Sequence, residues 1–292
     1  MPEALWGNLP NAIVTDLNPL IVTSPTPRCG TTLVQRLLCS STNALIYGEK
    51  CAQELEFFLQ LYTFKAQEYG YHRQTYQENL SKVLSGEVND WILDLTPDVD
   101  GYLLAMQKGA FAGVRYCREY AALQGRDVWG FKHPGWSPVF INLLHQLMPE
   151  ARTLVICRDL PACLRSAKAQ RMLDSEQAVR EFCESWKQGM AYWNHKEGEA
   201  GMMIVNYDDL VQNPGSLLQG ISAFSGVEGM KASILEEKVN IWRGREFANQ
   251  TSDGYIAPAE LSAGELQIME AVMAGTPFEV SRSPEVIQPE RR

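Results

Sequence analysis

The sequence predicts an α/β fold in which a parallel β-sheet is flanked by helices on both faces. Short apolar runs alternate with longer stretches of helical periodicity, as in strand–helix–strand units. The runs are apolar throughout, which is typical of parallel strands buried on both faces. With 292 residues, 45% of them hydrophobic and 21% charged, the chain is long enough for one large core.

Four apolar runs are the predicted strands, at residues 20–23, 128–132, 153–157 and 202–206. Residues 45–47 form a further candidate, and residues 91–95 form a weaker one. Helical periodicity predicts helices at 31–41, 54–67, 75–84, 101–124, 138–147, 161–171, 175–194, 214–225 and 259–274. Strands that alternate with helices in this way favour a parallel sheet.

No stretch of the sequence marks an interdomain linker, so we predict one domain over residues 1–292. Residues from about 52 to 100 are mostly helical and poor in strands, and we interpret them as a cap-like insertion over the site. The end that is rich in Pro, Glu and Arg, at 281–292, is predicted to be a flexible tail.

Composition and charge argue against several classes of protein. A net charge of −9 is unlike a general nucleic-acid-binding protein, which carries a basic face. Seven Cys residues without a C-x-x-C pair predict buried thiols in a reducing compartment, and four His residues without paired spacing predict no metal site. No signal region or apolar run of 18 residues is present, so we expect a cytoplasmic protein that does not enter a membrane.

The most informative motif, SPTPRCGTT at residues 24–32, lies between the first predicted strand and the first predicted helix. A loop in this position directs backbone N–H groups and a helix N-terminus at one point, which suits a phosphate. Arg28 adds a forked positive charge, and Thr31 and Thr32 add hydroxyls. The triphosphate motif G-x-x-x-x-G-K-[ST] has a Lys that this loop lacks. The sequence therefore predicts a P-loop-type sheet whose site is not built for a magnesium-bound triphosphate.

A second motif begins at Arg158, which follows the predicted strand at 153–157. Ligands bind at this end of the strands in open α/β sheets. Pro161 starts the next predicted helix, and Ser166 lies one to two turns into it. Arg158 and Ser166 so placed can clamp a second phosphate. The alternative interpretation is a surface Arg that pairs with Asp159.

Three further residues have both a chemical and a structural interpretation. Lys132, at the end of a predicted strand, can stabilise charge on a transferred group, or it extends its ammonium into solvent at the sheet edge. Glu49 is a candidate general base or a solvated surface carboxylate. Tyr207 is a core residue or a contact to a nucleobase, and Asp208 or Asp209 is the predicted cap of the helix that follows.

Together these motifs resemble the sulfotransferase family that uses 3′-phosphoadenosine 5′-phosphosulfate (PAPS). The family's Pro-Lys/Arg-Ser-Gly-Thr-Thr loop is matched by residues 27–32, with Cys29 in place of Ser. Its Arg-Asp-Pro motif, with a Ser eight residues after the Arg, is matched by Arg158 and Ser166, with Pro161 displaced by one position. Its Tyr-Glu-Asp-Leu stretch resembles residues 207–210, and the resemblance spans residues 20 to about 227.

In two spacings between motif residues, the chain resembles the tyrosylprotein and Golgi-type branch of the family more closely than the cytosolic phenol and steroid branch. The tyrosylprotein enzymes carry a catalytic Glu about 21 residues after the loop Arg, which is the spacing from Arg28 to Glu49. They carry a Lys 26 residues before the Arg that binds the 3′-phosphate, which is the spacing from Lys132 to Arg158. The chain departs from that branch in having no apolar anchor and no Arg residues shortly after Glu49.

The resemblance implies metal-independent transfer of a sulfuryl group from PAPS to an acceptor hydroxyl or amine, on a small molecule or another partner, with PAP as product. It implies Glu49 as general base, with Lys132 and Arg28 stabilising charge on the sulfuryl group and the departing oxygen. It further implies these donor contacts: Arg28, Cys29, Gly30, Thr31 and Thr32 at the 5′-phosphate, Arg158, Ser166 and Arg243 at the 3′-phosphate, and Tyr207 at the nucleotide.

Two other functions stay open at this point. One is a P-loop kinase-like phosphotransferase, against which the missing loop Lys counts. The other is a non-catalytic nucleotide-binding protein that binds the donor product and transfers nothing. Homo-oligomerisation is left open, and neither a nucleic acid nor a membrane is an expected partner.

Overall fold

The computed structural model describes residues 14–276, except 88, 90, 93, 94, 240, 242 and 244–246. Five parallel strands form one sheet in the order β2-β3-β1-β4-β5. The strands are β1 (Leu20–Thr23), β2 (Ala44–Tyr47), β3 (Val128–Lys132), β4 (Arg152–Cys157) and β5 (Met202–Asn206). The predicted α/β fold with a parallel sheet is confirmed, and so is the candidate strand at 45–47.

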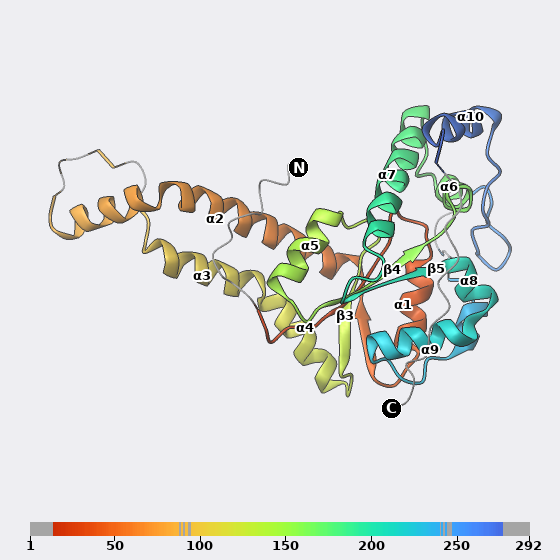
Figure 1. Ribbon diagram of the computed structural model, residues 1–292, viewed down its shortest axis with the longest axis horizontal. Helices are drawn as coiled ribbons and strands as arrows, with labels where there is room; N and C mark the ends of the chain where they lie inside the picture. The colour runs from red at the N-terminus through yellow and green to blue at the C-terminus, as the bar shows by residue number, and fades with distance from the viewer. Residues whose placement is uncertain are drawn as a thin grey trace.

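Ten α-helices and one 3-10 helix surround this sheet in the part of the chain described. They are α1 (Thr31–Cys39), α2 (Glu49–Leu84), α3 (Val99–Ala110), α4 (Ala112–Leu123), α5 (Pro138–Leu147), α6 (Leu160–Ala169), α7 (Glu176–His195), α8 (Tyr207–Gln212), α9 (Pro214–Ser225), η2 (Ala232–Glu236) and α10 (Ala263–Val272). They lie on both sides of the sheet, as Figure 1 shows.

Each face of the sheet has its own apolar core. On one face, Leu20, Val22 and Ile156 pack with side chains of α1, α8 and α9. On the other face, Ile21 and Phe131 pack with side chains of α2, α4, α5 and α7. Successive strand residues point to opposite faces, so a strand that is apolar throughout contributes to both cores.

The register brings the carboxyl ends of the central strands to one edge. Val22 of β1 pairs with Lys132 of β3 on one side and with Leu154 of β4 on the other. The loops that follow β1, β3 and β4 therefore leave the sheet at the same edge. Ligands bind at this edge in open α/β sheets, and the predicted phosphate loop is one of these loops.

Three elements differ from the sequence-based expectation. The predicted helices at 54–67 and 75–84 are parts of one continuous helix, α2, which runs through Gly70 without a break. The predicted helix at 101–124 is divided into α3 and α4 at Phe111, whose side chain is fully buried in the core. In the weak candidate strand at 91–95, the described residues Trp91, Ile92 and Leu95 are not in a strand.

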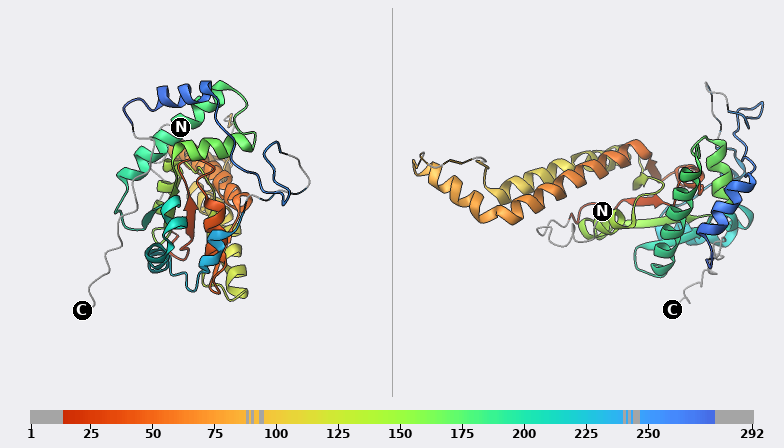
Figure 2. Two further views of the ribbon diagram at one scale, coloured as in Figure 1. Left: turned by 90° about the vertical axis from the view of Figure 1, so that its right-hand side faces the viewer. Right: turned by 90° about the horizontal axis from the view of Figure 1, so that it is seen from above.

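Helices α2 and α3 lie side by side as an arm that projects from the sheet (Figures 1 and 2). The first turns of α2 pack into the core through Ala52, Leu55 and Leu59. Farther out, Tyr62 and Ala66 pack against Leu103 of α3. The segment expected as a cap is thus helical, but its outer part extends away from the sheet rather than over it. The predicted tail, 281–292, lies outside the described residues.

Candidate functional site

The loop between β1 and α1 has the backbone shape that the motif predicts. Arg28 has a φ of 78° and Gly30 a φ of 98°, so both are in the left-handed region. Gly30 is the N-cap residue of α1, and no side chain in the described ranges caps this helix. The first N–H groups of α1 are therefore available to an anion, whose charge the helix dipole also favours.

Gly30 also packs directly beneath an aromatic ring. A Cβ atom at this position would lie 2.1 Å from Cδ2 of Tyr207. Both the positive φ and this close approach require glycine. Tyr207 is thereby placed against the phosphate loop, although it belongs to the distant helix α8.

Behind the loop, thiols and hydroxyls hold the backbone. The Ser24 hydroxyl donates to the Thr26 carbonyl over 2.7 Å. The sulfur atoms of Cys29 and Cys163 are 3.6 Å apart, and both residues are fully buried. Burial raises the pKa of the Cys163 thiol. Cys29 therefore supports the loop from the core side and does not line the cavity in front of it.

A cavity of about 340 Å³ opens in front of the loop. Eight of the predicted site residues line it: Arg28, Gly30, Thr31, Thr32, Glu49, Arg158, Ser166 and Tyr207. Lys132 lies next to this cavity, because its ammonium donates hydrogen bonds to Glu49 and Thr32, which line it. Arg243 is exposed and is not among the described residues that line the cavity.

Arg158 lies directly after β4 and is directed toward Tyr207. Its guanidinium carbon is 4.5 Å from the centre of the Tyr207 ring, and its Nε is 3.8 Å from a carboxylate oxygen of Asp208. That Nε is buried and has no hydrogen-bond partner within the described ranges. The indole of Trp186 donates to the Arg158 carbonyl over 2.9 Å and fixes the backbone. A buried guanidinium N–H without an acceptor is an unsatisfied donor, which an anionic ligand would satisfy.

Ser166 lies on α6, and its hydroxyl accepts a hydrogen bond from Nε of Arg28 over 3.1 Å. Burial lowers the pKa of the Arg28 guanidinium, and the carboxylate of Glu49 opposes this effect. The loop and α6 are thus joined across the cavity by Arg28 and Ser166. The two predicted phosphate-binding motifs meet in one site.

Glu49 and Lys132 form an ion pair at the edge of the cavity. The Lys132 side chain is 6% exposed and that of Glu49 is 52% exposed, so the ammonium is buried and the carboxylate reaches solvent. The Lys132 ammonium also donates to the Thr32 hydroxyl over 3.4 Å. Glu49 begins α2, directly after β2, which explains why a residue 83 positions away meets Lys132.

Helix α8, which carries Tyr207, is capped by Asn206 rather than by Asp208 or Asp209. The Asn206 side chain accepts hydrogen bonds from the backbone N–H groups of Asp208 and Asp209. The predicted cap was therefore wrong by two or three positions. Asp208 instead faces Arg158, and burial raises the pKa of its carboxyl while the nearby guanidinium opposes that shift.

A family model described as the sulfotransferase family matches residues 19–231. The chain belongs to this sulfotransferase family. The match includes the phosphate loop, Glu49, Lys132, Arg158 and Tyr207. The predicted membership of the sulfotransferase family is thus confirmed over most of the chain.

Among solved structures, the chain shows similarity to the following two proteins. The sulfotransferase domain of the olefin synthase from Synechococcus PCC 7002 is 17% identical, with a TM-score of 0.47, over 92% of this chain and 99% of that one. The sulfotransferase STF1 from Mycobacterium tuberculosis H37Rv is 14% identical, with a TM-score of 0.38, over 90% of this chain and 78% of that one. A comparison with curated proteins gave no significant match.

His133, Trp136 and Glu56 form a connected group near Glu49 and Lys132, but they are not among the residues that line the cavity. Burial lowers the pKa of His133, which stacks on Trp136 with 5.2 Å between ring centres. The Trp136 indole donates to a carboxylate oxygen of Glu56 over 3.0 Å, and burial raises the pKa of Glu56. Glu56 lies two helical turns after Glu49, and this spacing is the signal that could have found it.

No helix in the described ranges is long and apolar enough to cross a membrane. No group of three or more His, Cys, Asp or Glu side chains suited to a metal ion was found among the same residues. All seven cysteines are free thiols.

Proposed function

We propose that the protein transfers a sulfuryl group from PAPS to an acceptor hydroxyl or amine. The observation that carries this proposal is the placement of Arg158, which lines the same cavity as the phosphate loop and whose buried Nε makes no hydrogen bond within the described ranges. One anion site at a helix N-terminus and a second at Arg158 fit a nucleotide with phosphates at both the 5′ and 3′ positions.

The donor would be held by groups already in place. The N–H groups at the start of α1, with Thr31 and Thr32, would bind the 5′-phosphate. Arg158 and Ser166 would bind the 3′-phosphate. The Tyr207 ring, against Gly30 and Arg158, would limit how the nucleotide lies. The contact of Arg243 with the 3′-phosphate stays a prediction.

The chemistry that PAPS supplies when bound is an activated sulfuryl group on a phosphate leaving group. Glu49 is the proposed general base, because its carboxylate borders the cavity and reaches solvent, where an acceptor arrives. It removes the proton from the acceptor hydroxyl during an in-line displacement. Lys132 and Arg28 provide fixed positive charge for the oxygen atoms that become more negative.

We also propose the tyrosylprotein and Golgi-type branch, on the two spacings alone, and a cytoplasmic location.

Calorimetric titration with PAP, 5′-AMP and Mg-ATP tests the donor site. We expect PAP to bind with a dissociation constant on the order of micromolar, about −8 kcal/mol, and AMP to bind much more weakly. Replacement of Arg158 by Ala should weaken PAP binding by about tenfold or more, because a charged hydrogen bond contributes about 1.5–3 kcal/mol. The exposed Arg180 on α7 gives a matched control, Arg180→Ala, that should leave PAP binding unchanged.

Two outcomes would overturn parts of the proposal. Mg-ATP binding with no advantage from the 3′-phosphate would favour the kinase-like phosphotransferase. PAP binding without transfer from labelled PAPS to any acceptor of a broad screen would favour a non-catalytic nucleotide-binding protein. In that second case the donor-site assignment stands and the role of Glu49 falls.

A further inference from the structure

Helix α2 exposes a row of large apolar side chains along the arm. Phe57 is 59% exposed, Leu61 52%, Phe64 62% and Tyr71 86%. Their spacing of four, three and seven residues is that of the a and d positions in a heptad repeat, so they lie in one row on the helix. We call these four residues the arm stripe.

The arm stripe lies on the face of α2 opposite the one that packs within the chain. Leu55, Leu59, Tyr62 and Ala66 are buried and pack against the core or against α3. These positions are about half a helical turn away from the stripe, given 3.6 residues per turn. A helix that is apolar on two opposite faces is normally buried on both. Figure 1 shows α3 along one side of α2 and no other element along the outer arm among the parts described.

Side-chain contacts join α2 to α3 along the outer arm. Arg73 of α2 forms an ion pair with Asp100 of α3, with 2.7 Å between a guanidinium nitrogen and a carboxylate oxygen. A second hydrogen bond of 3.1 Å joins the same two side chains. This bidentate contact and the packing of Tyr62 against Leu103 hold the outer arm and keep the stripe facing outward.

We infer that the arm stripe is the contact of a homodimer in which two α2 helices pack antiparallel. In an antiparallel pair of identical helices, the same surface of both copies forms the contact. With Phe64 on the two-fold axis, Phe57 of one copy faces Tyr71 of the other. Three of the four stripe residues therefore face a stripe residue of the second copy.

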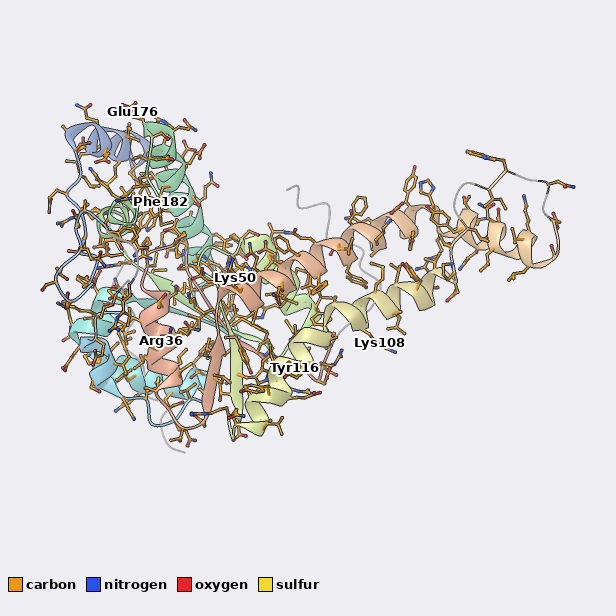
Figure 3. The ribbon with its side chains drawn as sticks, turned by 180° about the vertical axis from the view of Figure 1, so that it is seen from behind. Arg36, Lys50, Lys108, Tyr116, Glu176 and Phe182 are labelled. Atoms are coloured by element: carbon orange, nitrogen blue, oxygen red, sulfur yellow. The ribbon has the colours of Figure 1, made fainter. Side chains whose placement is uncertain are left out.

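Charge favours the antiparallel orientation over the parallel one. Lys50 and Glu78 lie at opposite ends of the same row, seven residues before Phe57 and seven after Tyr71, and both are exposed. In the antiparallel register Lys50 of each copy faces Glu78 of the other, whereas a parallel register would place like charges together. Figure 3 shows Lys50 at the end of α2 that adjoins the sheet.

With its full exposed area covered, the stripe reaches the lower limit of area for a specific contact. If each large side chain offers about 200 Å², the exposed fractions amount to roughly 500 Å² per copy. Two copies would bury about 1,000 Å² before the flanking polar groups are counted, which reaches the threshold for a specific interface.

Sedimentation velocity over the micromolar range tests the dimer. The wild-type chain should sediment as a species of twice its 32.8 kDa mass. Phe64→Glu places two carboxylates at the two-fold axis and should weaken the dimer by at least about 100-fold. Leu104→Glu is the matched control, because Leu104 is also exposed but lies on α3 and outside the stripe. This variant should remain dimeric, and circular dichroism should show the wild-type helix content in both.

A charge exchange tests the orientation. Lys50→Glu alone should weaken the dimer, and Lys50→Glu combined with Glu78→Lys should restore it, as only the antiparallel register predicts. A monomeric wild-type chain, or a Phe64→Glu variant that stays dimeric, would overturn the inference. If monomeric wild type binds vesicles of phosphatidylcholine and phosphatidylglycerol and Phe64→Glu does not, the stripe is a membrane contact and the dimer is rejected.

Discussion

The Glu49–Lys132 pair has a structural role in addition to the role in chemistry that we propose for it. The buried ammonium of Lys132 needs a counter-charge, and Glu49 supplies it from a position that solvent and substrate can reach. Removal of the Glu49 carboxylate would leave the buried Lys132 ammonium without its counter-charge, which is destabilising. A test of catalysis at Glu49 must therefore keep a hydrogen-bond acceptor for Lys132.

Glu49→Gln meets that requirement. We expect turnover to fall by about 10²–10⁴-fold, the usual contribution of general acid–base catalysis, because the amide cannot take the acceptor proton. PAP binding, measured by calorimetry, should stay at the wild-type value. Glu54→Gln, an equivalent change at an exposed carboxylate on the next turn of α2, should leave turnover unchanged. Wild-type turnover in Glu49→Gln would exclude Glu49 as the base.

Gly30 gives a second test, on the shape of the phosphate loop. Gly30→Ala should weaken PAP binding by tenfold or more, because the new methyl would overlap the Tyr207 ring and the positive φ costs about 1–3 kcal/mol. Gly48→Ala is the control, since its Cβ would meet nothing within 4 Å and its φ is −86°. Calorimetry measures both variants. Unchanged PAP binding in Gly30→Ala would mean that the loop moves freely relative to α8.

Among the secondary-structure elements, α8 is short but places two groups of the site. Its first residues, Tyr207 and Asp208, contact Gly30 and Arg158. A helix of six residues has little stability of its own and depends on its cap and its packing. Asn206 supplies the cap and thereby connects the end of β5 to Tyr207 at the cavity.

Asn206→Ala should lower the free energy of unfolding by about 1 kcal/mol, the usual effect of removing an N-cap side chain. It should also weaken PAP binding, because the start of α8 carries Tyr207. Asn206→Asp keeps an acceptor oxygen and should restore both properties. Urea denaturation and calorimetry measure the two effects. A loss of stability in Asn206→Ala without any effect on PAP binding would separate the cap from the site.

The sequence predicted the strands better than the helix boundaries. Apolar runs flanked by turn signals placed β1, β3 and β5 at their observed bounds, because burial on both faces leaves a strong pattern. The continuity of α2 through Gly70 and the break at Phe111 could not be predicted, since tertiary packing overrides local preference at both positions.

In the candidate site, residues in local motifs could be predicted from the sequence, and contacts between distant residues could not. Residues in contiguous motifs, such as Thr31 and Ser166, were found because a loop or helix start fixes their positions. The hydrogen bond between Trp136 and Glu56 joins residues 80 positions apart, so no local sequence pattern predicts that contact. Arg243 was inferred from the family resemblance alone, and the structure does not bring it to the cavity lining within the described residues.

The molecule as a whole should lose stability in mild acid. Burial lowers the pKa of His133 and His145, whose ordinary pKa is 6.5, so the folded chain favours their neutral forms. Glu49 and Lys132 act on His133 in opposite directions, as Glu199 and Lys196 do on His145. As the pH falls through 6.5, the unfolded chain takes up these protons first, and stability decreases.

We therefore expect the melting temperature to fall steadily from pH 7.5 to 5.5. The free energy of unfolding should change by at most about 1.4 kcal/mol per pH unit for each histidine. His145→Gln should reduce the slope, because it removes one of the two groups and can keep a hydrogen bond to the Thr153 hydroxyl. Scanning calorimetry at a series of pH values measures this, and a melting temperature independent of pH over this range would contradict it.

The strand order has a consequence for how the chain is made. β1 emerges from the ribosome well before both of its neighbours in the sheet, β3 and β4. Thr23 and His133, which are joined by a hydrogen bond, are 110 positions apart in sequence. At a translation rate of about 5–20 residues per second, β1 waits roughly 5–20 seconds for its first neighbour. During that interval its apolar residues are unpaired, so the nascent chain presents a natural binding site for chaperones.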